Sequence, residues 1–221
     1  KALRRRAKAG ATPLSQEWFR QRQRILTPAQ RRTLRTLFPV FGVELERGVV
    51  LDFPGLFPQN PGGPVILDVG FGQGESLLGA ARAMPHLNFL GVELHKASIA
   101  VTLRAAHAAN VSNVRVVRGE ATTLLREHLL PESLHQVWVL FPDPWLGKGD
   151  VSRRLIRDET KALIHSRLVD RGVLWVATDA APYAQHVRDV MLSPQTLPTG
   201  GVLGGGWDTV RDRTHAAGAR E

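Results

Sequence analysis

The chain has 221 residues, a formal net charge of +9 and no cysteine. This length fits one α/β domain with a modest extension, and the lack of cysteine excludes disulfides, thiolate metal ligands, iron–sulfur chemistry and a cysteine nucleophile. No apolar run is long enough to cross a bilayer and no signal-peptide pattern opens the chain, so we expect a cytoplasmic protein with no membrane partner.

The positive charge is concentrated at the N-terminus. Residues 1–35 contain eleven Lys or Arg side chains and one acidic residue, Glu17, whereas the rest of the chain is close to neutral. Such an arm is typical of contact with a phosphate backbone, although a solvated tail explains residues 1–10 equally well. We therefore predict a basic N-terminal arm and helix over residues 1–40, followed by a near-neutral domain over residues 41–221.

The first helix signal lies at the end of this arm. Thr27 is a helix cap, Pro28 suits the first helical position, and Gln30 completes a capping box. We expect Pro39 to end the helix and residues 41–63 to form loops.

From residue 64 onward the pattern alternates between strand and helix, which indicates parallel βαβ units. The predicted fold class is therefore α/β, with a Rossmann-like, doubly wound and mostly parallel sheet. We expect strands over 64–69, 88–92, 113–117, 135–140 and 172–177, and helices over 75–84, 96–109, 152–168 and 181–192.

A glycine-rich turn follows the first of these strands. Gly70, Gly72 and Gly74 carry no Cβ, so the backbone can turn sharply and approach a ligand closely. A dinucleotide fingerprint places its third glycine one position later and has a small residue where this chain has Glu75. Glu75 and the nearby Asp68 would repel a pyrophosphate but suit a sulfonium and an ammonium. The turn therefore favours S-adenosylmethionine over a nicotinamide or flavin dinucleotide.

Acidic residues follow the ends of several expected strands. Glu93 comes 23 positions after Gly70, close to the roughly 20 positions at which an acid reaches ribose hydroxyls. The carboxyl ends of parallel strands line one crevice, so we expect these acids to share an edge. They are Asp68, Glu75, Glu93, Glu120, Asp143 and Asp179.

A rigid acidic turn follows the fourth expected strand, at Pro142-Asp143-Pro144-Trp145. Two prolines restrict the backbone on both sides of Asp143, and Trp145 suits either stacking on a base or the floor of a pocket. A purely structural turn around a buried tryptophan is the alternative. No pair of histidines has the spacing of metal ligands, so we expect no metal site.

Together these motifs resemble the bacterial tRNA (guanine-N7)-methyltransferase family. The resemblance is carried by the stretches 68–75, 88–93, 141–145 and 177–184, and by the basic leader at 19–30. It implies a class I methyltransferase domain over residues 41–221, S-adenosylmethionine as cofactor, and methyl transfer to N7 of a variable-loop guanine in tRNA. A methyltransferase for another substrate and a weakly active or non-catalytic RNA-binding relative are the alternatives, and the oligomeric state stays open between monomer and homodimer.

The resemblance also implies roles for individual residues. Asp143 is the implied catalytic or guanine-positioning residue, beside the cofactor. This chain has Gly147 where the family has a substrate lysine, and the stretch 198–207 is rich in glycine, so we expect an incomplete C-terminal strand. The implied cofactor residues are Asp68, Gly70, Gly72, Gly74, Glu93, Glu120 and Asp143, and the implied substrate residues are Lys148, Arg153, Arg154, Asp179 and Thr214.

Overall fold

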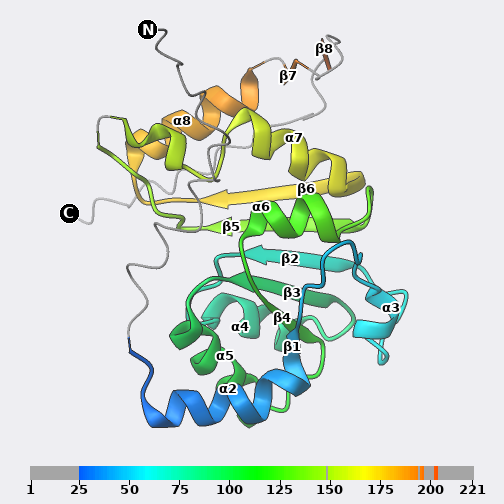
Figure 1. The fold of residues 1–221 in the computed structure, drawn as a ribbon. Helices are drawn as coiled ribbons and strands as arrows, with labels where there is room; N and C mark the ends of the chain where they lie inside the picture. The colour runs from blue at the N-terminus through cyan, green and yellow to red at the C-terminus, as the bar shows by residue number, and fades with distance from the viewer. Residues whose placement is uncertain (1–24, 148, 194, 197–201, 204–221) are drawn as a thin grey trace, which may run out of the picture.

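The computed structural model describes residues 25–147, 149–193, 195–196 and 202–203. Within these residues the chain builds a six-stranded sheet in which every neighbouring pair is parallel (Figure 1). The strand order is β1-β4-β3-β2-β5-β6. The strands are β1 (Gly42–Val43), β2 (Val65–Val69), β3 (Asn88–Glu93), β4 (Val114–Arg118), β5 (Leu134–Leu140) and β6 (Leu168–Ala177).

The strand order reverses at β2, which lies between β3 and β5. The chain adds β3 and β4 on one side of β2 and then returns to add β5 and β6 on the other side. The carboxyl ends of β2 and β5 therefore flank the switch point, where open α/β sheets bind their ligands. The prediction of a doubly wound parallel sheet is confirmed.

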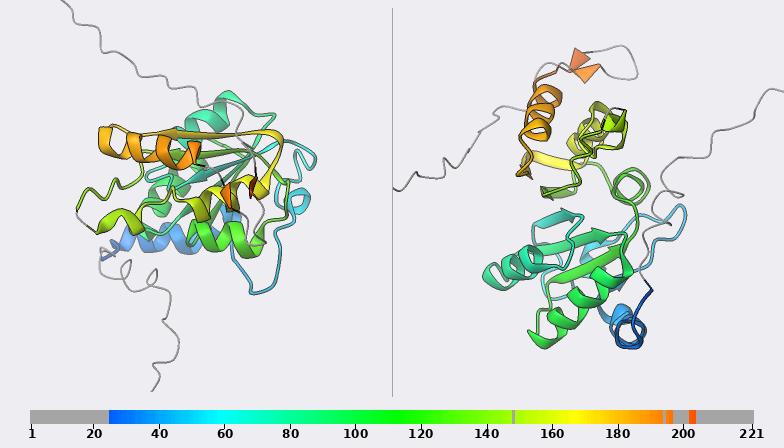
Figure 2. Two further views of the ribbon diagram at one scale, coloured as in Figure 1. Left: turned by 90° about the horizontal axis from the view of Figure 1, so that it is seen from above. Right: turned by 90° about the vertical axis from the view of Figure 1, so that its left-hand side faces the viewer.

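Helices cover both faces of the sheet (Figures 1 and 2). One face packs against α2 (Pro28–Phe41), α4 (Glu75–Ala83) and α5 (Lys96–Ala108). The other packs against the π-helical turn η1 (Leu124–His128), α7 (Asp158–Arg167) and α8 (Ala181–Leu192). Each face has its own buried apolar cluster.

Side-chain alternation along β2 shows why both faces are filled. Val65, Leu67 and Val69 enter the cluster under η1, α7 and α8, whereas Ile66 enters the cluster under α4 and α5. Successive strand residues point to opposite faces, so Asp68 lies on the same face as Ile66. An acid is consequently the second-to-last residue of a strand that is buried along its whole length.

The first helix extends past the residue expected to end it. Helix α2 begins with the predicted capping box at Thr27 and Gln30, but it continues through Pro39 to Phe41. A proline this close to the end removes only one helical hydrogen bond, and Phe41 gains burial in the core below α4 and α5. The prediction that Pro39 ends the helix was therefore wrong.

Two short elements lie in the region expected to be loops. Strand β1 pairs with β4 through Gly42 and Val43, and the short helix α3 spans Phe53–Leu56. Neither is long enough to show a periodic pattern, so the expectation of loops over residues 41–63 was wrong at these two places.

The expected helix over 152–168 is divided. The 3-10 turn η2 (Asp150–Arg153) is followed by extended residues, and α7 begins only at Asp158. Burial of Arg154 and Ile156 keeps the segment between them extended, and the Thr160 hydroxyl accepts a hydrogen bond from the Arg157 N–H at 2.9 Å.

The sheet also differs from expectation at its β6 edge. Strand β6 begins at Leu168 rather than at residue 172, because Leu168 pairs with Leu134 before the register shifts. Further along, β7 (Gln195–Thr196) and β8 (Val202–Leu203) form a separate antiparallel pair. The short helix α6 (Ala121–Thr123), which precedes η1, was not anticipated. The division of the chain at residue 40 and the incomplete C-terminal strand stay predictions.

Candidate active site

The turn after β2 has the conformation that its glycines allow. Gly70, Gly72 and Gly74 have φ values of 72°, 57° and 79°, a region that side chains disfavour. A Cβ on Gly74 would come within 2.5 Å of the Thr102 side chain. A Cβ on Gly70 or Gly72 would meet no atom of the described residues within 4 Å. The space over these two glycines is therefore open, as a close-fitting ligand requires.

The end of β2 presents a buried carboxylate beneath this turn. Asp68 is 1% exposed, and its Oδ2 has no hydrogen-bond partner among the described residues. Burial, followed by repulsion from Glu93, raises the pKa of Asp68 from 3.8 to about 7. A buried acceptor without a partner is costly, so this position is suited to a ligand that brings a donor or a positive charge.

Glu93, at the end of β3, is tied to the glycine turn. Its Oε2 accepts a hydrogen bond from the Gly72 N–H at 3.1 Å, and its Oε1 accepts from the N–H groups of Leu94 and His95 at 2.6 and 2.9 Å. The predicted second-strand acid therefore lies at the same edge as the turn. These bonds use three of the roughly four acceptor positions of the carboxylate, and only 9% of Glu93 is exposed. One acceptor position is therefore left for a ligand, with little access to bulk solvent.

Glu120 follows β4, the next strand along this edge. Its carboxylate accepts hydrogen bonds from the hydroxyls of Thr122 at 2.8 Å and Thr123 at 3.4 Å. The Gly119 N–H donates to the Glu93 carbonyl oxygen at 3.1 Å, which joins the ends of β3 and β4. The edge thus carries an acid at or close to the carboxyl end of each of three adjacent strands. Their contact with a cofactor stays a prediction.

The turn that carries Asp143 follows β5, which pairs directly with β2. Phe141 and Trp145 have φ values of 51° and 43°, and the Phe141 N–H donates to the Ala177 carbonyl oxygen at 2.8 Å. A non-glycine residue with a left-handed backbone conformation costs about 1–3 kcal/mol, and such residues cluster at functional sites. The Asp143 side chain is exposed, so it is accessible to a substrate that enters from solvent.

The two arginines of the expected substrate set have different surroundings. The Arg153 guanidinium lies 3.3 Å from the centre of the Trp145 ring and pairs with Asp150 at 3.1 Å. Arg154 is buried, and it donates to the carbonyl oxygens of Pro144 at 3.1 Å and Trp145 at 3.3 Å. Sequence reasoning missed this internal position, because its signal is a contact with a turn ten residues earlier.

The other expected substrate residues are less constrained by the structure. Asp179 follows β6 and is exposed, and the Thr178 hydroxyl beside it accepts a hydrogen bond from the Ala180 N–H at 3.1 Å. Lys148 and Thr214 lie outside the described residues. Their roles, like those of Arg153 and Arg154 toward a substrate, stay predictions.

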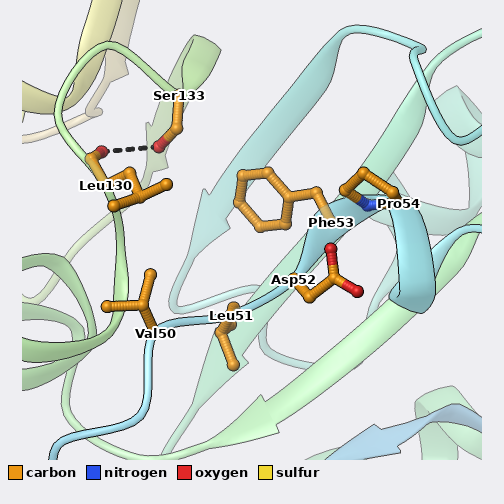
Figure 3. A pocket seen from close by; sticks show the side chains of 7 residues that line it. All are labelled: Val50, Leu51, Asp52, Phe53, Pro54, Leu130 and Ser133. Atoms are coloured by element: carbon orange, nitrogen blue, oxygen red, sulfur yellow. Dashed lines mark hydrogen bonds between the residues drawn. The ribbon is translucent and has the colours of Figure 1, made fainter.

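A shallow pocket of about 340 Å³ lies at the opposite, amino edge of the sheet (Figure 3). It is formed by the segment before α3 and the loop before β5, which are joined by a hydrogen bond from the Leu51 N–H to the His128 carbonyl oxygen at 2.8 Å. It is therefore separate from the glycine turn. Its lining residues are Val50, Leu51, Asp52, Phe53, Pro54, Leu130 and Ser133.

The described part of the chain has neither a metal-binding cluster nor a membrane-spanning helix. No group of three or more His, Asp or Glu side chains there is placed to hold a metal ion. No helix in the same ranges is long and apolar enough to cross a membrane.

The doubly wound sheet and the open glycine turn define a Rossmann-like α/β fold. The chain is a methyltransferase by family, because the model of a family described as "Putative methyltransferase" matches residues 62–199. A tRNA (guanine-N(7)-)-methyltransferase of Halorhodospira halophila is 40% identical over 179 residues, which are 81% of this chain and 77% of the relative. The protein of that name from Escherichia coli K12 is 39% identical over 175 residues, or 79% of this chain and 72% of the relative. The chain belongs to the tRNA (guanine-N7)-methyltransferase family.

Among solved structures, the chain is similar to a 30S ribosomal A1408 methyltransferase from an uncultured bacterium. The TM-score is 0.47 at 18% identity, over 65% of this chain and 68% of the other. It is also similar to a precorrin-6y C5,15-methyltransferase from Geobacter metallireducens, with a TM-score of 0.46 at 16% identity, over 73% of this chain and 68% of the other. Family membership follows from the sequence relatives alone.

Glycine substitutions separate ligand binding from backbone strain. Gly72→Ala is expected to weaken S-adenosylmethionine binding, because its Cβ would enter the open space over the turn. Gly48→Ala is the matched control, since Gly48 has φ 77° and its Cβ would also meet no described atom within 4 Å, but it lies outside the turn. Both variants should lose about 1–2 kcal/mol of stability from the left-handed backbone. Calorimetric titration and thermal melting measure the two effects, and equal affinities in both variants would contradict the cofactor position.

Proposed function

We propose that this protein transfers a methyl group from S-adenosylmethionine to N7 of a guanine in tRNA. The observation that carries the proposal is the pairing of β2 with β5, which brings two different acids to one edge. One strand carries the buried Asp68 next to its last residue, before the open glycine turn, and the other leads to the exposed Asp143 on a rigid turn. The names of relatives about 40% identical over most of their length support the choice of tRNA.

The residues at the edge fit the cofactor. Gly70 and Gly72 leave the space that a close ligand needs, and the Asp68 carboxylate has an unpartnered oxygen for a positively charged group. Glu93 and Glu120 supply further acceptors, which suit ribose hydroxyls and an adenine amino group. When bound, S-adenosylmethionine would supply an electrophilic methyl group on a positively charged sulfur.

The chemistry required of the protein is mainly positioning. Guanine N7 has a lone pair and no proton, so no general base is needed for its attack. The new bond joins N7 to the methyl carbon, the sulfur–methyl bond breaks, and its electron pair stays on sulfur. The base gains a positive charge. Asp143 would accept hydrogen bonds from the N–H edge of the base and stabilise this charge.

The substrate side includes the outer surface of α2. Arg31, Arg32 and Arg35 are exposed on this helix, and phosphate contacts from arginine supply much of the affinity of proteins for nucleic acids. We also propose that the methylated guanine is the one in the variable loop of tRNA. The same proposal places the protein in the cytoplasm.

Methyl transfer followed by nucleoside analysis tests the function. The protein is incubated with methyl-labelled S-adenosylmethionine and tRNA that lacks 7-methylguanosine, and the digested nucleosides are separated by chromatography beside standards of the isomeric methylguanosines, which share one mass. We expect label in 7-methylguanosine. Label in another nucleoside would indicate a methyltransferase of different specificity. Cofactor binding without any label in tRNA would favour a non-catalytic relative.

The contribution of α2 is tested by changing Arg31, Arg32 and Arg35 together to Gln. Each phosphate contact contributes about 0.7–0.9 to the slope of log affinity against log salt concentration, so the slope should become less steep by roughly 2–3. Cofactor affinity should stay the same, because the glycine turn is separate from this helix. Filter binding of tRNA across a salt series measures the slope.

The matched control removes the same charge elsewhere, by changing Arg82, Arg126 and Arg171 to Gln. Arg82 ends α4, Arg126 lies on η1 and Arg171 lies near the start of β6, all away from α2. If both triple variants change the slope equally, the effect comes from net charge and α2 has no specific role.

A further inference from the structure

The turn that carries Asp143 is held at both of its ends. At the first end the Phe141 N–H donates to the carbonyl oxygen of Ala177 at 2.8 Å. At the second end Arg154 Nε donates to the Pro144 carbonyl oxygen at 3.1 Å, and its Nη2 donates to that of Trp145 at 3.3 Å. Proline fixes its own φ and restricts the ψ of the residue before it, but it leaves its own ψ and the φ of the following residue free. The second end of the turn therefore depends on the Arg154 guanidinium.

The backbone at that end requires such support. Trp145 has φ 43°, a conformation that persists in a non-glycine residue only where the surroundings enforce it. Hydrogen bonds from a charged donor are roughly twice as strong as neutral ones, and two of them act here on adjacent carbonyl groups. Without them we expect Trp145 to relax toward negative φ, which would turn the peptide group that joins Pro144 to Trp145 and thereby shift the residues before it, Asp143 included.

Arg154 is itself held in place from α8. It is 9% exposed, and its guanidinium carbon lies 5.6 Å from the ring centre of Tyr183, which is fully buried. The Tyr183 hydroxyl accepts a hydrogen bond from the Ile156 N–H at 3.3 Å, and His186 Nε2 lies 2.8 Å from the Ile156 carbonyl oxygen. Ile156, two residues after Arg154, is thus held to α8 through both its backbone N–H and its carbonyl group.

The charge of Arg154 is directed at the turn rather than at an acid. No carboxylate in the described part of the chain forms a salt bridge with it, although buried charges are usually paired. Arg153, the preceding residue, lies instead against the Trp145 ring and pairs with Asp150. The two neighbouring arginines therefore contact the turn in different ways, one through its backbone and one through a side chain.

We propose that Arg154 is a positioning residue, which fixes the backbone of Pro144 and Trp145 and thereby the direction of the Asp143 carboxylate. This role replaces the direct substrate contact that the family resemblance implies for Arg154, because its buried guanidinium donates to two backbone carbonyl oxygens of the turn. Its effect on methyl transfer rests on the function proposed above, whereas its effect on the shape of the turn does not.

Kinetics of Arg154→Gln test the catalytic part. The single-turnover rate at saturating cofactor should fall by about 10²-fold, the loss that a small misplacement of a catalytic group produces. Arg154→Lys keeps the charge but loses the two-point geometry, so it should recover only a small part of the rate. Because Arg154 acts through Asp143, Arg154→Gln combined with Asp143→Asn should be no slower than Asp143→Asn alone. Multiplied losses would overturn the proposal.

Arg167→Gln is the matched control. Arg167 also donates to two backbone carbonyl oxygens, those of Leu125 at 2.6 Å and Arg126 at 3.4 Å, but these lie on η1. Arg167→Gln also removes a guanidinium that binds two backbone carbonyl groups, so we expect it to lower stability as Arg154→Gln does. Its rate of methyl transfer should be that of the wild type. An equal loss of rate in Arg167→Gln would show that general stability, rather than the turn, explains the effect of Arg154.

Fluorine NMR of protein labelled with 5-fluorotryptophan tests the turn itself, with the Trp145 signal assigned from Trp145→Phe. We expect this signal to move in Arg154→Gln and to stay in place in Arg167→Gln. If the wild type methylates no tRNA, the proposed function fails, and the fluorine spectra still decide the structural role. An unchanged Trp145 signal in a folded variant overturns the proposal. If Arg154→Gln does not fold, Arg154→Lys is measured by the same two methods.

Discussion

Asp143→Asn is expected to lower the single-turnover rate of methyl transfer to tRNA by about 10²-fold or more, the scale of removing one preorganised electrostatic contact. The substitution keeps the size of the side chain and removes its negative charge. Methylation at N7 makes the guanine a cation, and a fixed carboxylate stabilises that charge as it develops. An amide also offers only one acceptor oxygen to the N–H edge of the base.

The stability of the fold should not change with this substitution. Asp143 is exposed, and surface substitutions usually change the free energy of unfolding by less than about 0.5 kcal/mol. Thermal melting should therefore match the wild type, and the rates are compared at saturating cofactor because Asp143 is also an implied cofactor residue. Asp52→Asn is the control, because Asp52 is an exposed acid at the opposite edge of the sheet. A wild-type rate in a well-folded Asp143→Asn protein would leave the turn with an architectural role alone.

The glycine turn is the part of the site that local sequence describes well. A buried strand, closely spaced glycines and a helix follow one another within residues 65–83, and each signal comes from the residues that form the element. The parallel direction of the strands follows from the alternation of strands and helices. Glu93 could be placed at the edge for the same reason, because the ends of parallel strands meet there.

The segment after the Asp143 turn could not be predicted in the same way. Residues 152–168 have a helical composition, yet the chain stays extended after η2 because Arg154 reaches the turn and Ile156 reaches α8. These contacts join residues ten and more positions apart. A pattern within one window carries no information about them, so tertiary contacts override the local preference.

The state of Asp68 is another property of the assembled sheet. The sequence places an acid near the end of the strand, but the burial of its side chain comes from the face covered by α4 and α5 and from the neighbouring strands. The absence of a partner for Oδ2 within the described residues emerges only when every nearby donor has been placed. This unsatisfied oxygen makes the strongest prediction about the cofactor.

Asp68→Asn is expected to weaken S-adenosylmethionine binding by at least about 30-fold. Removing one member of a buried charge pair costs about 2–5 kcal/mol, and each 1.4 kcal/mol is tenfold in affinity. The asparagine amide retains the shape of the side chain but brings its own donor toward a positively charged ligand. Asp170→Asn is the control, because Asp170 is an exposed acid on β6.

The same substitution should stabilise the ligand-free protein above neutral pH. The pKa of Asp68 is about 7 in the fold, against 3.8 as its ordinary value, so the folded state holds a proton that the unfolded state releases. The contribution of Asp68 to stability is therefore fully present below pH 4 and is lost as pH rises through 7. Between pH below 4 and pH above 7, the free energy of unfolding should fall by about 4 kcal/mol through this group. An asparagine does not titrate and should remove this pH dependence.

Cofactor binding should have the opposite dependence on pH. A cationic ligand favours the ionised carboxylate, so binding releases the proton of Asp68, and affinity in the wild type should rise as pH increases through 7. Asp68→Asn should show an affinity that is low and independent of pH in this range. Calorimetric titration in buffers of different ionisation enthalpy measures both the affinity and the proton released. The useful range is pH 5.5 to 8.5, roughly 1.5 units on each side of the raised pKa of Asp68. A wild-type affinity that does not change over this range would show that Asp68 does not face the cation.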